Sequence, residues 1–495
     1  MNVNMIDRHV LEIIPLSSPK QQRCLLSVNQ TIQITNDGRG IAESLAHQLI
    51  EKGYRRTQIV EHISPECDVV IALDGLAQFA NINEAIHCNA RVFHYAKTVA
   101  NRFSERGGIF ITVQTTGGQF KFNQRNEYYA WTSGLAALVK TAAQEWPRAI
   151  CHAIDLEINR QTSDELAQML FKHLLGGHTQ LECGLLANGK IITPQLTNAA
   201  LNIKTLDVPI DKNTVIVASG GARGITASCL LTLAKNYQPH IILLGRTSLK
   251  AEDSFTASLS SEQEIRHALI THYKSKQESF TLPTINQKIK SILAQREATA
   301  NIALLKSTGA EVSYFDCDIL NLDALDTVFT QIRKQHGKIS GILHGAGVLS
   351  DKLILQKSNE QFDHVFNTKV YGLKNLLAVT QQDKLRFLLL FSSVAARFGN
   401  VGQSDYAMAN EVLNKVAQQE QQKRGKSCFV KSYNWGPWES GMVTQELAKL
   451  FAQRGIKLLS TEHGTQLFLH ELTDPHHVEV IFGGRLDHVS SLSLH

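Results

Sequence analysis

The sequence lacks the features that define several classes of protein. Its eight cysteines include no C-x-x-C pair, so neither a metal site nor a disulfide framework is expected. No apolar run approaches the roughly 20 residues that a membrane helix needs. Residues 1–15 lack the basic start and the apolar core of a secretory signal peptide. These absences predict a cytoplasmic protein that has reduced thiols and does not bind a membrane.

Strong charge and biased composition are also missing. The formal net charge is only +5 and no basic block stands out, so nucleic acid is not an expected partner. Hydrophobic residues make up 43% and charged residues 19%, which is ordinary globular usage and excludes a disordered or collagen-like chain. At roughly 100–200 residues per domain, the 495 residues predict two to four domains.

Short apolar runs alternate with longer helical patterns, which is typical of a doubly wound α/β sheet with helices on both faces. The alternation predicts two Rossmann-like halves joined by a linker at residues 197–213. Residues 248–300 are too long for a βα loop and predict an inserted pair of helices in the second half. The second half has about seven expected parallel strands: Val215–Ser219, Ile241–Gly245, Glu311–Asp316, Gly341–Gly345, Leu385–Ser392, Cys428–Asn434 and Val478–Phe482.

The first of these strands runs into a glycine-rich turn that opens a helix. In Ser219-Gly-Gly-Ala-Arg-Gly224, the glycines at 220 and 224 have the spacing of a short-chain dehydrogenase loop. Glycines there let the backbone approach a pyrophosphate, which lies on the helix N-terminus. A tight turn would also use glycine, but the strand–loop–helix context favours nucleotide binding. Where a third glycine is expected, the chain has Thr226.

The end of the second strand indicates which dinucleotide binds. An acidic residue there would hydrogen-bond the ribose 2′-hydroxyl of NAD, but the strand ends in Gly245-Arg246-Thr247. The guanidinium of Arg246 suits a 2′-phosphate, and Arg223 in the glycine loop adds a second cation. Either arginine alone is commonly a solvated surface residue, whereas the two together predict NADPH as the cofactor.

Four polar residues form a pattern suited to carbonyl reduction. Ser393 follows the fifth strand, and Tyr406 comes 13 residues later. A tyrosine can protonate the developing alkoxide if a cation lowers the phenol pKa, and a serine hydroxyl can hold the carbonyl. Short-chain reductases usually have lysine four residues after this tyrosine and asparagine on the preceding helix. Here Asn410 follows Tyr406 and Lys369 lies on the earlier helix, so the two residue types have exchanged places.

This exchange resembles the ketoreductase domains of modular and iterative polyketide synthases, which belong to the short-chain dehydrogenase/reductase superfamily. The resemblance runs from Thr214 to the end of the chain. Within that family the chain looks most like the ketoreductases of bacterial polyunsaturated fatty acid synthases, which share the threonine at 226 and the inserted helices. The further motifs that match are Leu343-His-Gly-Ala-Gly-Val348, Phe391-Ser-Ser-Val-Ala395, Gly402-Gln-Ser-Asp-Tyr-Ala-Met-Ala-Asn410 and Asn434-Trp-Gly-Pro-Trp438.

The resemblance implies a division of labour between the halves. Residues 1–205 look like the structural subdomain of the family, a truncated Rossmann-like half without catalysis. Residues 206–495 look like the catalytic, NADPH-binding subdomain, with a helical insertion near 250–300 and a lid near 437–465. The segment Thr35-Asn-Asp-Gly-Arg-Gly40 resembles a degenerate glycine loop that only turns the chain.

The resemblance also implies roles for the site residues. Tyr406 protonates the substrate oxygen and Ser393 orients the carbonyl. Lys369 holds the cofactor ribose and lowers the tyrosine pKa, and Asn410 positions that lysine. His344 is expected to pack rather than to carry a proton. The residues expected to bind the cofactor are Gly220, Gly221, Arg223, Gly224, Ile225, Arg246, Thr247, Asp318, Ile319, Gly345, Ala346, Gly347, Lys369 and Tyr406.

The implied activity is the NADPH-dependent reduction of a β-ketoacyl thioester on an acyl carrier protein, in polyketide or polyunsaturated fatty acid synthesis. The carrier protein and other synthase subunits or domains are the implied partners. Leu349-Ser-Asp351 keeps one aspartate of the family's B-type motif, which favours a 3R hydroxyl product. Two alternatives stay open: a non-catalytic docking module of a synthase, and a short-chain enzyme of another chemistry such as an epimerase.

Overall fold

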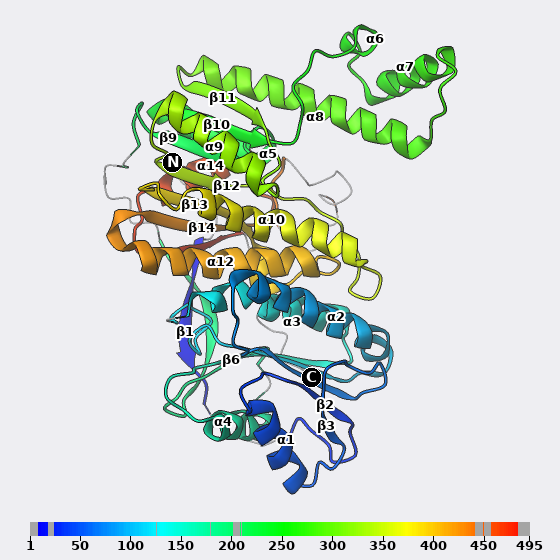
Figure 1. Ribbon diagram of the computed structural model, residues 1–495, viewed down its shortest axis with the longest axis vertical. Coiled ribbons are helices and arrows are strands. Elements are labelled where there is room, and N and C mark those ends of the chain that lie inside the picture. The colour runs from blue at the N-terminus through cyan, green and yellow to red at the C-terminus, as the bar shows by residue number, and fades with distance from the viewer. Residues whose placement is uncertain are drawn as a thin grey trace.

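A single continuous sheet of fifteen strands runs through both halves of the described part of the molecule (Figure 1). The computed structural model describes residues 8–17, 24–124, 126–178, 180–200, 208, 210–440, 449 and 457–483. Among these residues, no helix combines the length and the apolar character needed to cross a bilayer. The expected fold class, α/β with parallel strands in two Rossmann-like halves, is confirmed.

The second half contributes the seven parallel strands that the sequence predicts. They are β9 (Val215–Ser219), β10 (His240–Gly245), β11 (Glu311–Asp316), β12 (Gly341–His344), β13 (Phe387–Ser393), β14 (Phe429–Trp435) and β15 (Glu479–Phe482). The chain starts at β9, moves outward to β10 and β11, and returns to pair β12 with the other side of β9. This reversal places the carboxyl ends of β9 and β12 side by side, where doubly wound sheets bind ligands.

Helices cover both faces of these seven strands because the strands are buried on both sides. One face carries α9 (Leu322–His336), α10 (Asn359–Val379) and α12 (Ser404–Arg424). The other carries α5 (Gly224–Tyr237), α8 (Leu282–Ser307) and α14 (Thr461–Glu471).

The first half repeats this plan in truncated form. Helices α1 (Ile41–Glu51) and α4 (Ser163–Gly176) cover one face, and α2 (Ile82–Arg106) and α3 (Gly134–Glu145) cover the other. Its parallel strands are β2 (Ile32–Thr35), β3 (Thr57–Val60), β4 (Val69–Gly75), β5 (Ile109–Gln114), β6 (Ile150–Leu156) and β7 (Glu182–Leu185).

Two antiparallel strands that the sequence did not predict join the halves. Strand β1 (Arg8–Pro15) pairs with β15 on one side and with β8 (Ile191–Asn198) on the other, and β8 pairs with β7. The first strand of the chain is therefore bonded to its last described strand. Part of the expected linker at 197–213 belongs to β8, and the expected boundary at residue 205 lies outside the described residues.

The halves also share a hydrophobic core. Helices α2 and α3 of the first half pack against α10 and α12 of the second, as Figure 1 shows, and their buried side chains form one cluster. Phe93 of α2 stacks on Phe362 of α10 with ring centroids 4.4 Å apart. Separating the halves would expose this apolar surface to water.

The insertion between β10 and β11 is helical, as expected. It holds α6 (Ser254–Ala257), α7 (Glu262–Ser275) and the long α8, and α6 and α7 project from the body of the molecule in Figure 1. A small apolar cluster of its own ties α7 to the start of α8. The lid expected near 437–465 falls mostly on residues outside the described ranges.

A buried ion pair at the start of β1 should stabilise both halves together. The Arg8 guanidinium contacts the carboxylates of Glu471 and Asp474, and the side chains of Arg8 and Glu471 are 5% and 0% exposed. Arg8→Met should lower the free energy of unfolding by about 3 kcal/mol, because breaking a buried pair leaves an uncompensated charge. Urea unfolding followed by tryptophan fluorescence measures this. The matched change Arg56→Met, at an exposed arginine, should stay within about 0.5 kcal/mol; equal stabilities of the two variants would contradict the prediction.

Candidate active site

The glycine loop between β9 and α5 lies against the loop that follows β12. Gly220 has a φ of +70°, and a Cβ added there would lie 2.8 Å from the Cα and N atoms of Ala346. Only glycine therefore fits this approach. Gly221 packs against Leu230, and Gly224 opens α5 with a φ of +58° and no atom within 4 Å of an added Cβ. No side chain therefore crowds the Cβ position of Gly224 at the start of α5.

The threonine that replaces the third glycine has a partner in the second loop. Thr226 is buried in the first turn of α5, after Ile225, and faces Gly345. A Cβ added to Gly345 would lie 2.4 Å from Thr226 Oγ1. A glycine in one loop therefore compensates for the glycine missing from the other, and the two loops still pack closely.

The inserted helix α8 reaches the glycine loop, which the sequence did not predict. The Gly224 N–H donates to Glu297 Oε1 at 2.9 Å, and Asn301 Nδ2 donates to the Ala222 carbonyl at 3.0 Å. The two side chains are four residues apart and therefore lie on one face of α8. This spacing is the only feature of the sequence that pointed to a shared partner. The insertion thus contacts the glycine loop, and the Glu297 carboxylate takes one backbone N–H that the expected pyrophosphate would use.

The two expected phosphate-binding arginines follow neighbouring strands. Arg223 follows β9, Arg246 follows β10, and both are exposed at the carboxyl edge of the sheet. The carbonyl of Thr247 accepts a hydrogen bond from Tyr314 Oη at 2.6 Å, which fixes the chain just beyond Arg246. The arrangement leaves both guanidinium groups accessible to an anion.

The segment after β11 has backbone roles in this structure. Asp318 Oδ1 accepts from the Leu320 N–H at 3.0 Å, as a turn cap does. The Ile319 carbonyl accepts from Asn375 Nδ2 of α10 at 2.9 Å. Both residues lie at the edge expected for the cofactor, but their observed contacts are structural.

Three elements bring the expected catalytic side chains together. Ser393 ends β13, Tyr406 lies in the first turn of α12, and Lys369 lies in the middle of α10. Lys369 Nζ is 5.5 Å from the centre of the Tyr406 ring and donates to the Phe391 carbonyl at 2.8 Å. A Cβ added to Gly347 would lie 3.0 Å from Lys369 Cε, so the lysine also touches the loop after β12.

The side-chain amide of Asn410 uses its nitrogen in a hydrogen bond, whereas its oxygen has no hydrogen-bond partner. Its Nδ2 donates to the Tyr406 carbonyl at 2.8 Å, one turn earlier on α12. Its Oδ1 is buried without a hydrogen-bond partner. A buried unpaired acceptor is costly, so this atom suits a donor that arrives with a ligand or a water.

Burial dominates the electrostatics of the site. It lowers the pKa of Lys369 to about 7, because no carboxylate in the described part of the chain pairs with this lysine. Burial also raises the pKa of Tyr406, and hydrogen bonding by Asn410 and Ser393 opposes part of the rise. The expected lowering of the tyrosine pKa by Lys369 stays a prediction, with Lys369 Nζ 5.5 Å from the centre of the Tyr406 ring.

His344 links the site to the sheet, in keeping with the expected packing role. Its Nε2 is 3.0 Å from the Lys369 carbonyl and its Nδ1 is 2.7 Å from Ser219 Oγ. A carbonyl can only accept, so Nε2 carries the proton and Nδ1 accepts from the serine. Burial lowers the pKa of His344 to about 3, which favours the neutral ring with its one N–H.

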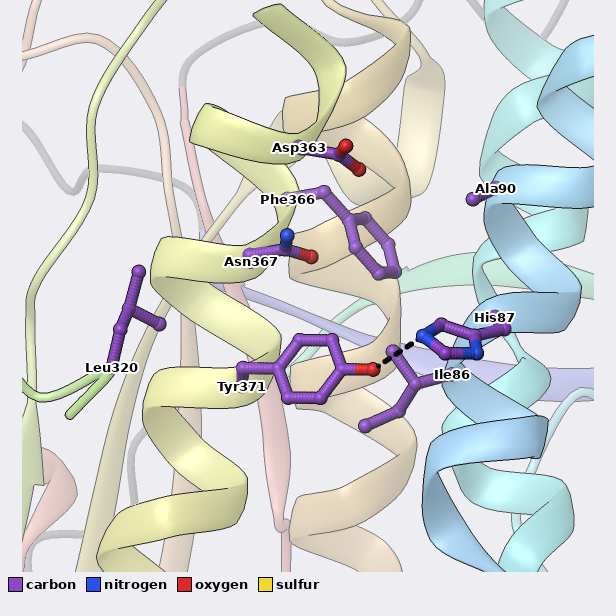
Figure 2. Close-up of a pocket in the computed structure, with 8 residues that line it drawn as sticks. All are labelled: Ile86, His87, Ala90, Leu320, Asp363, Phe366, Asn367 and Tyr371. Atoms are coloured by element: carbon purple, nitrogen blue, oxygen red, sulfur yellow. Dashed lines mark hydrogen bonds between the residues drawn. The ribbon is translucent and has the colours of Figure 1, made fainter. Parts of the chain in front are cut away.

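A pocket of about 360 Å³ lies elsewhere, between α2 and α10 (Figure 2). His87 and Tyr371 close one end through a 2.9 Å hydrogen bond, drawn as a dashed line in Figure 2. None of the expected catalytic residues lines this pocket. Lys369 is two residues from Tyr371 along α10, so its side chain leaves the helix in another direction.

Comparison with known proteins identifies the family in which this combination of residues occurs. The KR domain family matches residues 214–440. A polyunsaturated fatty acid synthase chain of Thraustochytrium sp. is 32% identical over 388 residues, which are 76% of this chain and 14% of that protein. Residues 214–440 belong to the KR, or ketoreductase, domain family. The expected resemblance to ketoreductase domains of polyketide and polyunsaturated fatty acid synthases is thereby confirmed.

Two further comparisons concern the length of the relatives and the fold of the chain. Polyketide synthase PksL of Bacillus subtilis is 26% identical over 355 residues, which are 70% of this chain and 7% of that protein. The chain therefore spans a small part of the multidomain synthases that it resembles. A solved ketoreductase domain from the bacillaene assembly line covers 99% of this chain, and this chain covers 100% of it, with a TM-score of 0.69 and 20% identity, so both halves have its fold.

The exchanged lysine can be tested directly. Lys369→Ala and Tyr406→Phe should each lower the rate of NADPH oxidation with a β-ketoacyl thioester by roughly 10²–10⁴-fold, the range of general acid catalysis. The two losses should not multiply in the double variant, because both groups serve one proton transfer. Lys374→Ala is the control, since Lys374 is half-buried and its Nζ donates to Asn83 Oδ1 of α2 at 2.8 Å. Near-normal turnover of Lys369→Ala would refute the assignment.

Proposed function

We propose that the chain reduces a β-ketoacyl thioester, carried on an acyl carrier protein, to the β-hydroxyacyl thioester with NADPH. The convergence of Lys369, Ser393 and Tyr406 beside the glycine loop of a KR domain carries the proposal. The completeness of this set favours catalysis over the docking-module alternative. The direct test is to follow NADPH oxidation with a carrier-bound thioester and to identify the β-hydroxy product by mass spectrometry.

The side chains suit the protonation half of the reaction. NADPH, when bound, would supply a hydride to the β-carbon of the substrate. Ser393 would hold the carbonyl oxygen and Tyr406 would donate its phenolic proton to the alkoxide that forms. Lys369 would bind the ribose, and nearby phosphate charge would favour its ammonium form and so raise its pKa from about 7. The free Oδ1 of Asn410 would accept from Lys369 or a bridging water.

The partners follow from the relatives. The named relatives are a polyunsaturated fatty acid synthase and a polyketide synthase, in which this region is a minor part of the protein. We therefore propose a carrier protein and other synthase domains as the partners, and residues 1–205 as a non-catalytic support. Asp351 accepts from Gln403 Nε2 at 2.9 Å and lies close enough to raise the pKa of Tyr406. Because Asp351 is the aspartate kept from the B-type motif, we propose the 3R hydroxyl product.

Cofactor preference should follow the two arginines. NADPH should outcompete NADH by at least about tenfold, because one charge-assisted contact of roughly 1.4 kcal/mol gives that factor. Arg246→Asp should shrink or reverse the preference. Arg266→Asp, the same charge change on the exposed part of the insertion, should leave it unchanged. Steady-state kcat/KM with each dinucleotide measures this, and equal values for the unmodified protein would rule the assignment out.

A further inference from the structure

One carboxylate of the first half holds two loops of the active site. Glu145 is the last residue of α3 and is half-buried. Its Oε2 accepts from the Ile354 N–H at 2.7 Å, and its Oε1 accepts from the Gly402 N–H at 2.9 Å. The first N–H belongs to the loop after β12 and the second to the turn before α12. Glu145 therefore bridges two segments of the other half with one rigid group.

The same two segments are bonded to each other beside the catalytic tyrosine. The Lys352 N–H donates to the Gly402 carbonyl at 2.9 Å. Lys357 Nζ and Asp405 Oδ2 form a 2.8 Å ion pair, with 0% and 2% of the two side chains exposed. Asp405 Oδ1 accepts from the Tyr406 N–H at 2.9 Å. The backbone that aims Tyr406 is thus held by the bridge between these loops.

The end of α3 makes further contacts with this turn. Gln144 Nε2 donates to the Phe398 carbonyl at 2.6 Å, and the Asn400 N–H lies 3.4 Å from Thr141 Oγ1. A Cβ added to Gly399 would lie 2.6 Å from the carbonyl carbon of Lys140. Each of these contacts touches one segment, whereas Glu145 alone among them joins the turn to the loop after β12.

We propose that Glu145 is a positioning residue for the reduction: through its two charge-assisted hydrogen bonds, the first half sets the distance between Tyr406 and the substrate side of the site. This rests on the proposed function. Hydrogen bonds to an ionised acceptor are roughly twice as strong as neutral ones, so the bridge resists distortion. Displacing a reacting group by about 1 Å can cost about 10²-fold in rate. Neither hydrogen bond of Glu145 goes to the glycine loop or to Gly345–Gly347, so NADPH affinity should change much less than kcat.

The substitution Glu145→Gln tests this with little change of volume. The amide keeps one acceptor but presents an N–H₂ donor to the second N–H, so one of the two loops is released. We expect kcat to fall about 10–100-fold, and the Kd for NADPH and the melting temperature to stay close to those of the unmodified protein. In a Tyr406→Phe background the same change should cost little more.

A matched control crosses the same interface. Glu127 also reaches from the first half to α12, where its Oε2 lies 3.5 Å from Lys423 Nζ and from Gln419 Nε2, far along the helix from Tyr406. Glu127→Gln should leave kcat unchanged. Equal kcat values for the Glu145→Gln variant and the unmodified protein would overturn the proposal. Equal losses of kcat, NADPH affinity and melting temperature would also overturn it, since they would indicate general destabilisation.

Hydrogen exchange separates this inference from the proposed activity. Amide exchange measured by mass spectrometry should rise in the segments 350–357 and 398–406 of Glu145→Gln, and not in Glu127→Gln. An unmodified protein that reduces no β-ketoacyl thioester would refute the proposed function, while this exchange pattern would still report whether Glu145 holds the loops. Unchanged exchange in both segments would refute the positioning role.

A second, independent cluster lies at the opposite edge of the sheet. His240 begins β10, Glu311 begins β11 and His336 ends α9, and one ligand atom from each lies within 4.8 Å of the others. His240 Nδ1 is 3.1 Å from Glu311 Oε2, and His336 Nδ1 is 3.6 Å from Glu311 Oε1. Ligands about 2.0–2.1 Å from a tetrahedral zinc ion are separated by roughly 3.3 Å.

The hydrogen bonds of this cluster are poor. His240 Nδ1 is buried and makes no well-directed hydrogen bond, and the other nitrogen of His336 is 3.4 Å from Ser313 Oγ. The His336 side chain is only 8% exposed. The geometry points to a structural site for a borderline divalent cation such as Zn²⁺, which would pin the outer strand to α9. This metal site could not be predicted from the sequence, because its three ligands lie far apart along the chain.

Metal titration tests this site. After dialysis against a chelator, the chain should bind one ZnCl₂ equivalent by calorimetry and give the visible bands of tetrahedral Co²⁺ with CoCl₂. His240→Gln and His336→Gln should each weaken binding at least tenfold. His47→Gln is the control, because His47 faces Glu51 at 3.6 Å on α1 without a second histidine. No saturable binding, or binding that survives both changes, would refute the site.

Discussion

The antiparallel pairing of β1 is the interaction on which the rest of the structure depends. This strand closes the gap between β15 of the second half and β8 of the first, and so turns two sheets into one. Arg8 anchors it against Glu471, which also pairs with Lys431 at 3.1 Å. Because the charges are buried, the strand cannot leave without exposing unpaired ions. The orientation of α3 toward the site, and with it the reach of Glu145, follows from this junction.

Buried charge also ties the helical layers together. Lys140 of α3 pairs with Glu182 of β7 at 3.1 Å, and Glu182 also contacts Arg397 of the second half. Nearby, Lys415 lies 2.9 Å from Glu411 and 3.2 Å from Glu479. Three cations thus face three carboxylates where the halves meet. The contact of Arg397 with Glu182 crosses between the halves, so the interface includes a buried ion pair as well as apolar packing.

What the sequence could predict followed from patterns local to the chain. Buried parallel strands are near-continuous apolar runs, so β13 was expected within two residues of its observed start at Phe387. The spacing of Lys369, Ser393, Tyr406 and Asn410 predicted the candidate site, because spacing can be read from the sequence alone. Strand β1 was missed because Arg8–Pro15 mixes charged and apolar residues and pairs with strands about 180 to 470 residues away.

Other features had no sequence signature at all. Glu145 bonds to backbone N–H groups, which every residue but proline has, so nothing in its partners could mark it. The contact of Glu297 with the glycine loop depends on how α8 lies across the sheet. The raised pKa of Tyr406 follows from desolvation in the folded chain. Each of these is a tertiary property.

The shared sheet has a consequence for how such domains can be exchanged between synthases. The family match begins at residue 214, yet the strand that seals the edge of β15 begins at residue 8. A graft cut at the family boundary would leave that edge open to pairing with other chains, which is a route to aggregation. It would also remove α3, and with it a carboxylate that holds the catalytic turn. A graft that keeps this sheet closed therefore has to include the span from β1 to β15.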